Sequence, residues 1–387
     1  MPHRSAVRHW DIFCTVIDNY GDIGVTWRLA RQLQHEFGQS VRLWVDDLAS
    51  FARLCPDLDP TRDEQPQHGV TLRRWPTAFP NDIATADVVI EAFGCQLPDG
   101  YLASMAARAV KPVWLNLEYL SAEDWVEGCH GLPSPHPRLP LTKYFFFPGF
   151  SERTGGLICE AGLLAERARW QADAAAQTAY WNALGVPPRA EDDELRVSLF
   201  SYATPAAGEL LTAWASGARP VRVLVPEGKV LADVARVFGE ETLKAGEVRQ
   251  RGSLTVHVLP FTDQPGYDRL LWSCDFNIVR GEDSFVRAQW AARPFLWHIY
   301  WQEEDAHLVK LDAFLSHYGA SLSDSARHAL ITAAHAWNRG QGMDAAWAGL
   351  APQLDELQRH AQGWPKQALG SADLASRLVQ MVENTLQ

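Results

Sequence analysis

Short apolar runs typical of β-strands alternate, along the first half of the chain, with stretches whose apolar positions recur at helical spacing. After the first run, Ile23, Trp27, Ala30, Leu33 and Phe37 follow a helical period, so we expect a helix directly behind the first strand. This alternation is typical of a parallel α/β sheet. The strands predicted for this half lie at residues 11–17, 41–45, 88–93 and 113–117.

The same alternation returns in the second half, where each predicted strand is again followed by a helical pattern. Between the halves, a long helical stretch over 163–184 ends at Gly185, with Pro187 just beyond, which is a typical helix stop. The doubling indicates two similar domains. The strands predicted for the second half lie at residues 195–200, 221–225, 254–259 and 275–279.

The end of the chain has an amphipathic pattern of its own. Leu374, Leu378, Met381 and Val382 share one helical stripe after a break at 363–365, and we expect this helix to pack back on the first domain. The predicted organisation is therefore a Rossmann-like domain at 1–165, a helical linker at 166–189, a second Rossmann-like domain at 190–363 and a returning helix at 364–387.

Composition narrows the class of protein. The chain has 387 residues, of which 47% are apolar and 21% charged, and this fits two globular domains with their own cores. No stretch approaches the roughly 20 apolar residues of a membrane span, so a cytoplasmic protein is expected. The net charge of −12 argues against a nucleic-acid surface. The six scattered cysteines are interpreted as reduced packing residues.

Candidate chemistry lies where predicted strands end, because parallel sheets bind ligands at their carboxyl edge and two such domains can enclose a cleft. The first strand runs into the turn 18–24, which holds two carboxylates, Asp18 and Asp22. Gly21 and Gly24 do not make the G-x-G-x-x-G pattern of a dinucleotide site. The turn is thus a candidate reaction site, with the alternative that Asp22 only caps the following helix.

A second cluster, at 279–285, repeats this context in the other half. Arg280 and the free N–H groups of a helix start would attract a diphosphate. Glu282 and Asp283 would repel it unless they point elsewhere, so backbone amides and Ser284 are the better phosphate ligands; a plain helix cap at Asp283 or Ser284 is the alternative.

Three further positions follow strands of the second half. Phe200 and Tyr202 lie at a strand end, where an aromatic ring can stack on a base or ribose; core packing is the alternative. Gln264 follows another strand and could form hydrogen bonds with the edge of a base. In the first half Glu118 is within reach of an acceptor, or is a surface carboxylate.

A metal site has little support. The only Asp-x-Asp pattern, Asp57 to Asp59, is enclosed by Pro56 and Pro60 and reads as a turn. We therefore expect no catalytic metal.

Five motifs together resemble the elongation factor P arginine rhamnosyltransferases, and the likeness spans almost the whole chain. The resemblance implies a GT-B fold and transfer of L-rhamnose from dTDP-β-L-rhamnose with inversion. Besides this donor substrate we expect no cofactor. The resemblance implies elongation factor P as acceptor, a partner that is thereby activated to relieve ribosome stalling at polyproline. Since a lone guanidinium offers too few contacts for specificity, we expect the folded N-terminal domain of this factor to be recognised and not a short peptide. The motifs are at residues 18–24, 115–120, 132–135, 200–202 and 280–284.

The resemblance also assigns roles to residues. It makes 1–165 the acceptor domain, with Asp22 as general base and Asp18 beside it in the acceptor site, and it makes 190–363 the donor domain. Glu118, at the end of a predicted strand, is expected to bind the acceptor as well. The resemblance places Phe200, Tyr202 and Gln264 around the thymidine. Along the ribose and diphosphate it places Arg280, Glu282, Asp283, Ser284 and Tyr300, the last of these by resemblance alone.

Three alternatives stay open at this point. One is another GT-B transferase with a lipopolysaccharide or small-molecule acceptor. The second is a nicotinamide-dependent oxidoreductase, which the doubled α/β pattern also fits and the missing glycine fingerprint disfavours. The third is a binding protein of the same fold without turnover.

Overall fold

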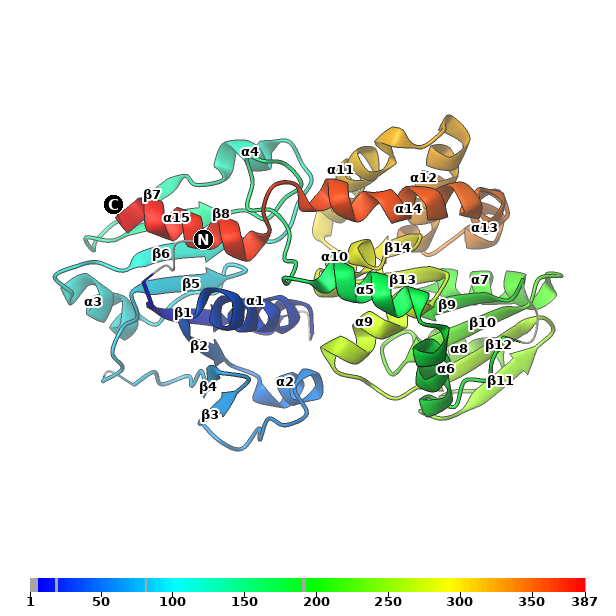
Figure 1. Ribbon diagram of the computed structural model, residues 1–387, viewed down its shortest axis with the longest axis horizontal. Helices are drawn as coiled ribbons and strands as arrows, with labels where there is room; N and C mark the ends of the chain where they lie inside the picture. The colour runs from blue at the N-terminus through cyan, green and yellow to red at the C-terminus, as the bar shows by residue number, and fades with distance from the viewer. Residues whose placement is uncertain (1–5, 18–19, 81, 190–192, 387) are drawn as a thin grey trace. The chain divides into compact units, whose positions relative to one another are not determined.

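The computed structural model describes residues 6–17, 20–80, 82–189 and 193–386. The chain divides into two compact units, one made of residues 1–161 with 368–387, and the other of residues 162–367 (Figure 1). The terminal helix α15 (Leu374–Leu386) belongs to the first unit, where it packs on the first helix and on strand β6 (Val113–Leu117).

The first unit is built on an eight-stranded sheet in the part of the chain that the structure describes, with the order β3-β4-β2-β1-β5-β6-β8-β7. The pairs β3/β4 and β7/β8 are antiparallel and the other pairs are parallel. Its further strands are β1 (His9–Cys14), β2 (Ser40–Val45), β3 (Glu64–Gln67), β4 (Val70–Arg74), β5 (Val88–Ala92), β7 (Pro133–Pro135) and β8 (Thr142–Phe146), and its further helices are α1 (Gly21–Phe37), α2 (Leu48–Leu54), α3 (Asp99–Ala107) and α4 (Trp125–Cys129).

The second unit has a six-stranded sheet within the described residues, ordered β11-β12-β10-β9-β13-β14 and parallel except at β11/β12. Its strands are β9 (Leu195–Leu199), β10 (Val221–Pro226), β11 (Val248–Arg251), β12 (Leu254–Leu259), β13 (Phe276–Arg280) and β14 (Phe295–His298). Its helices are α5 (Leu163–Ala172), α6 (Ala174–Ala183), α7 (Pro205–Ser216), α8 (Leu231–Val237), α9 (Gln264–Ser273), α10 (Asp283–Trp290), α11 (Ala306–Tyr318), α12 (Asp324–Arg339), α13 (Met343–Leu350) and α14 (Leu354–Leu369).

Two helix predictions are wrong in detail. The stretch 163–184 is not one helix, because Asp173 leaves the helical conformation and its carboxylate accepts from the N–H of Ala176, which starts α6. The linker predicted at 166–189 also packs within the second unit, where the Trp170 indole donates to Ser273 Oγ at 2.8 Å. Gly185 does end α6, in the left-handed conformation (φ 68°).

The break predicted at 363–365 is also wrong, because α14 continues through Pro365 to Leu369. Tertiary packing holds this segment helical: Trp364 is buried and its indole N–H donates to Gln289 Oε1 at 2.9 Å. The chain turns instead at Gly370, whose φ of 59° favours glycine.

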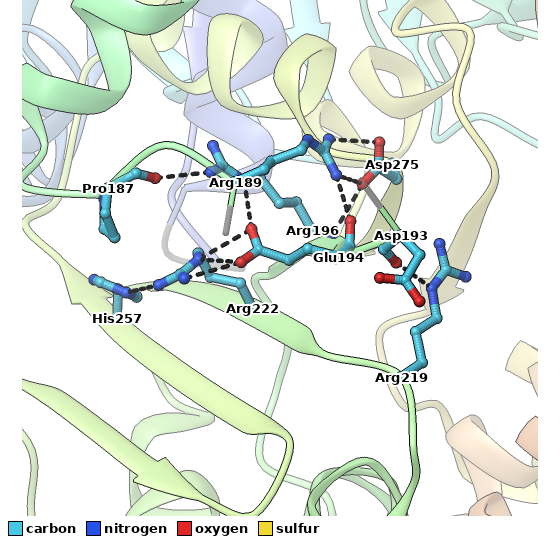
Figure 2. A network of polar contacts seen from close by, with 9 residues as sticks. All are labelled: Pro187, Arg189, Asp193, Glu194, Arg196, Arg219, Arg222, His257 and Asp275. Atoms are coloured by element: carbon cyan, nitrogen blue, oxygen red, sulfur yellow. Dashed lines mark hydrogen bonds and ion pairs between the residues drawn. The ribbon is translucent and has the colours of Figure 1, made fainter. Parts of the chain in front are cut away.

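Buried charges connect the amino ends of the strands in the second sheet (Figure 2). Glu194, just before β9, accepts from Arg196 at 3.0 Å and from Arg222 at 2.9 Å, and all three side chains are buried. Arg222 Nη1 lies 2.6 Å from Nε2 of His257, and burial together with this cation lowers the pKa of His257 to about 4. His257 is thus neutral and accepts the Arg222 hydrogen bond.

The same network fastens the segment that leads into β9. Arg189 donates to both carboxylate oxygens of Asp275 at 2.9 Å, and Arg196 Nη2 donates to the carbonyl of Pro187 at 2.8 Å. These groups lie at the opposite edge of the sheet from the candidate site described below.

Two further observations concern the described residues as a whole. None of their helices is both long and apolar enough to cross a membrane. Each of the six cysteines is a free thiol, as expected from their scattered positions.

Candidate active site

In the first unit the candidate residues follow the carboxyl ends of β1 and β6, two parallel strands that both pair with β5. Strand β1 ends at Cys14, earlier than expected, because the Val16 N–H donates to the Asp46 carboxylate at 2.9 Å and not to a neighbouring strand. The chain then passes through the turn and enters α1 at Gly21. Asp18 lies outside the described residues.

Asp22 stands in the first turn of α1 and is 2% exposed. Its Oδ2 accepts from the Ile17 N–H at 2.9 Å, and its Oδ1 accepts from the Tyr119 hydroxyl at 3.1 Å. The residue at the helix cap is Tyr20, so the alternative that Asp22 is the helix cap does not hold. Asp22 instead closes the turn and meets a residue from a second strand end.

Tyr119 also contacts the residue that follows β5, the strand that lies between β1 and β6 in the sheet. Its ring stacks on Phe93 with a centroid distance of 4.7 Å and an interplanar angle of 19°. Phe93 directly follows β5 and has a φ of 57°, a conformation that few side chains adopt. The chain therefore bends sharply at the end of β5, and the bend places a flat ring under Tyr119.

Glu118 follows β6 and is partly exposed. Its backbone N–H donates to the carbonyl of Phe146 at 2.9 Å, and its side chain accepts from the amide of Asn116. The first unit thus presents a buried carboxylate and a partly exposed one at the ends of strands in one sheet. Such a pair suits a cationic acceptor.

In the second unit, Phe200 and Tyr202 follow β9, and Arg280 ends the neighbouring strand β13. The Arg280 guanidinium carbon lies 4.7 Å from the centroid of the Phe200 ring and 4.8 Å from that of Tyr202. The predicted base-stacking residues and the predicted phosphate ligand are therefore in contact. Core packing alone does not describe Tyr202, which is partly exposed.

Tyr300, predicted from resemblance only, joins this group. It follows β14, is 46% exposed, and meets the edge of Tyr202 at a centroid distance of 5.9 Å. The Tyr202 ring also packs on His298, whose Nδ1 lies 2.7 Å from Ser201 Oγ. Burial, with Arg280 and His307 nearby, lowers the pKa of His298 to about 3. His298 is therefore a neutral support for the Tyr202 ring.

The turn from β13 leads directly into the start of α10. Gly281, with a φ of 61°, makes the turn, and the Trp297 indole donates to its carbonyl at 2.7 Å. Helix α10 then begins at Asp283, so its first N–H groups and Ser284 lie just beyond β13. Lys310 pairs with the Glu282 carboxylate at 3.1 Å. The repulsion that Glu282 would exert on a phosphate is thus partly neutralised.

Gln264 is the first residue of α9 and is buried, one turn from Tyr267. Tyr267 meets the edge of Phe200 at 5.5 Å between centroids. The helix that carries Gln264 is thus in contact with the aromatic group at the end of β9.

The Asp57 to Asp59 segment behaves as a turn. Asp59 Oδ1 accepts from the Thr61 N–H at 2.9 Å, and Asp57 is exposed. No group of three or more His, Cys, Asp or Glu side chains among the described residues is arranged to hold a metal ion.

Three residues without an expected role lie at the candidate site. Tyr119 donates to Asp22, His298 packs on the Tyr202 ring, and Lys229 Nζ lies 5.7 Å from the centroid of that ring. Tyr119 lies inside a motif that the sequence analysis singled out. His298 ends β14, a strand that the apolar pattern did not reveal. Tyr119 and Lys229 lie shortly after the strands β6 and β10, and His298 is the last residue of β14.

Comparison with known proteins places this geometry in context. The model of the family described as elongation factor P (EF-P) rhamnosyltransferase EarP matches residues 10–383. The protein-arginine rhamnosyltransferase of Pseudomonas putida is 55% identical over 379 residues, covering 97% of this chain and 99% of the relative. That of Pseudomonas aeruginosa is 53% identical over 377 residues, with coverage of 97% and 99%.

Two solved structures resemble this chain, one at high and one at low sequence identity. One, described as the structural basis for EarP-mediated arginine glycosylation of translation elongation factor EF-P, has a TM-score of 0.70 at 40% identity and covers 98% of this chain and 99% of its own. A UDP-glucosyltransferase from Polygonum tinctorium shares the fold alone, with a TM-score of 0.53 at 10% identity and 99% of each chain covered. The predicted GT-B fold is confirmed.

Proposed function

From the premise that this chain belongs to the EF-P rhamnosyltransferase family and is a protein-arginine rhamnosyltransferase, we propose that it transfers L-rhamnose from dTDP-β-L-rhamnose to one arginine of EF-P with inversion. The observation that carries the proposal is the family match over residues 10–383, since the family is described by this acceptor. The modified factor would then relieve ribosome stalling at polyproline. A translation factor as acceptor also supports a cytoplasmic reaction.

An arginine is a difficult nucleophile. Its guanidinium keeps its proton up to about pH 12.5, while an ordinary Asp has a pKa of about 3.9. The gap of roughly 8.6 units corresponds to about 12 kcal/mol, so complete deprotonation before attack would consume most of an enzyme's catalytic capacity. Proton transfer should therefore follow the start of C–N bond formation.

Asp22 is our candidate for the base. As the arginine nitrogen bonds to the anomeric carbon, its proton becomes acidic and a carboxylate in hydrogen-bond reach can accept it. The Ile17 N–H and the Tyr119 hydroxyl each hold one oxygen of Asp22, which supports a fixed orientation. Glu118, and Asp18 in the same turn as Asp22, would bind the remaining N–H groups of the guanidinium.

The leaving dTDP gains negative charge as its bond to the sugar breaks. Arg280, Ser284 and the N–H groups of α10 are our candidates to stabilise that charge. Phe200, Tyr202 and Gln264 would hold the thymidine, and Asp283 and Tyr300 would line the ribose and diphosphate. Since these groups can supply the electrostatic stabilisation, we propose that the reaction needs no metal.

The acceptor is proposed to be recognised as a folded domain. A single guanidinium offers too few contacts to distinguish one arginine from all others, so surface around the target must contribute. A flexible peptide would also lose about 1 to 2 kcal/mol per ordered backbone residue on binding. The isolated N-terminal domain of EF-P should thus have a much higher kcat/KM than a linear peptide with the same arginine.

Mass spectrometry of EF-P after incubation with the enzyme and dTDP-β-L-rhamnose tests the proposal. We expect one added deoxyhexose on one arginine, with and without EDTA. Absence of the adduct, with full activity on another acceptor, would contradict EF-P as the target. Activity lost in EDTA and restored by Mg²⁺ or Mn²⁺ would contradict metal independence.

Asp22→Asn tests the assignment of the base. The variant keeps the shape of the side chain, so dTDP affinity should stay within a factor of about two while transfer falls by at least about 10³-fold. Turnover near the wild-type rate would remove Asp22 as the base. A parallel loss of dTDP affinity and melting temperature would indicate a structural role in the turn.

A further inference from the structure

Three acidic side chains near the carboxyl edge of the second sheet have partners within the protein. Asp233 accepts from the Thr204 N–H at 2.7 Å and pairs with Arg236, and Asp263 accepts from the Gly266 N–H at 2.8 Å. Glu282 pairs with Lys310. These three carboxylates are thus not partners of Lys229, a cation at the same edge.

Lys229 lies in the loop between β10 and α8, is exposed, and forms no ion pair with any carboxylate among the described residues. Its Nζ lies 5.7 Å from the centroid of the Tyr202 ring. Arg280 lies 4.8 Å from the centroid of the same ring, so two cations share one aromatic side chain of the candidate donor site.

The loop that carries Lys229 is held in place on both sides. The Glu227 N–H donates to the carbonyl of Leu259 at 3.0 Å, which joins the loop to the end of β12. On the other side, a Cβ built at Gly228 would stand 3.3 Å from the Phe200 ring, so the backbone passes close to that ring. Lys229 is thus a flexible side chain on a positioned backbone, at the end of the strand next to β9.

We propose that Lys229 is a second cationic ligand of the donor diphosphate, which stabilises the leaving group together with Arg280. Two like charges beside one ring repel each other, and an anionic diphosphate between them removes that repulsion. The thymine and the rhamnose are neutral and would not. The inference rests on the proposed function, because it takes the nucleoside diphosphate of that reaction as the ligand.

Charge is conserved in the step that Lys229 would assist. The bond between the anomeric carbon and the diphosphate oxygen breaks, and its electron pair stays on that oxygen. The arginine nitrogen forms the new bond to the anomeric carbon and gives its proton to Asp22. The products are the rhamnosyl arginine and dTDP with one more negative charge, which Lys229 would bind more tightly than the ester it replaces.

Calorimetry with dTDP on the full chain tests the proposal. Lys229→Ala should weaken dTDP binding about tenfold at low salt, because it removes a charge-assisted contact. Lys229→Arg keeps the charge and should stay within about threefold. Lys244→Ala removes another exposed lysine of the same unit and should leave binding unchanged. In about 1 M salt, where charges are screened within roughly 3 Å, the loss in Lys229→Ala should shrink.

Two outcomes would overturn the inference. One is dTDP affinity in Lys229→Ala within a factor of two of wild type. The other is a loss of thymidine affinity in Lys229→Ala that equals its loss of dTDP affinity. Ligand-observed NMR measures thymidine binding, and a contact to the diphosphate would leave it unchanged.

A wrong assignment of the donor would give a different result from a wrong assignment of Lys229. A wild-type chain that binds UDP and not dTDP would contradict dTDP-rhamnose, and the same variants titrated with UDP would still measure the contribution of Lys229. A wild-type chain that binds neither diphosphate would overturn both proposals.

Discussion

The two edges of the second sheet both bury arginines and use them in opposite ways. At the amino edge, Arg196 and Arg222 converge on the buried carboxylate of Glu194 (Figure 2). At the carboxyl edge, Arg280 is 4% exposed and lies over the rings of Phe200 and Tyr202. Aromatic faces attract a guanidinium through their π-electrons and carry no net charge themselves. Burial alone therefore does not distinguish a structural arginine from a binding one; the nature of its neighbours does.

The largest effect is expected from breaking the amino edge. Glu194→Ala leaves two buried guanidiniums without their shared carboxylate, and should lower the free energy of unfolding by about 3 to 5 kcal/mol. Urea denaturation measures this. The folded fraction should keep its dTDP affinity, because the network lies at the other end of the strands. A loss of affinity at full stability would contradict the separation of the two edges.

Arg280→Met should show the reverse behaviour. Methionine keeps apolar contact with Phe200 and Tyr202 and removes the charge, so stability should change little. We expect dTDP affinity to fall by about 1.5 to 3 kcal/mol, the range for hydrogen bonds to charged groups. Calorimetry and a melting curve are measured on the same sample. Unchanged affinity with a lower melting temperature would place Arg280 with the structural arginines.

Phe200→Ala and Tyr202→Ala test the aromatic half of the carboxyl edge. Each should weaken dTDP-rhamnose binding by about 1 to 3 kcal/mol if a ring stacks on the base or packs on the ribose. Tyr202→Phe keeps the ring as a matched control. If affinity is unchanged in both alanine variants and only the melting temperature falls, the two rings are core residues.

The smallest effect concerns pH at the amino edge. The pKa of folded His257 is about 4, below the ordinary value of about 6.5, so unfolding takes up a proton between these pH values. The stability from neutral His257 is therefore complete above pH 6.5 and is lost as the pH falls toward 4. His257→Gln should flatten this decline, relative to wild type, in denaturation series from pH 7.5 to 4.5. An equal decline in both proteins would remove His257 as a contributor.

The sequence predicted the strands better than the long helices. The predicted bounds of seven strands agree closely with the structure, because buried parallel strands are continuous apolar stretches in the sequence. These strands are β2, β5, β6, β9, β10, β12 and β13. The break expected at Pro365 failed because the penalty of a proline inside a helix is local, while the burial of Trp364 and its bond to Gln289 are tertiary. Edge strands such as β7, with two exposed prolines, carry no apolar pattern.

At the candidate site too, the local sequence predicted some features and missed those that depend on tertiary contacts. By itself the sequence determined that Asp22, Glu118, Tyr202 and Arg280 each follow an apolar run, since the period of a strand and the start of a helix depend on neighbouring residues. The contact of Tyr119 with Asp22, 97 positions apart, and that of Arg280 with Phe200 and Tyr202 appear only in the folded chain. These contacts depend on the order of strands in each sheet, which long-range packing sets and no local pattern encodes.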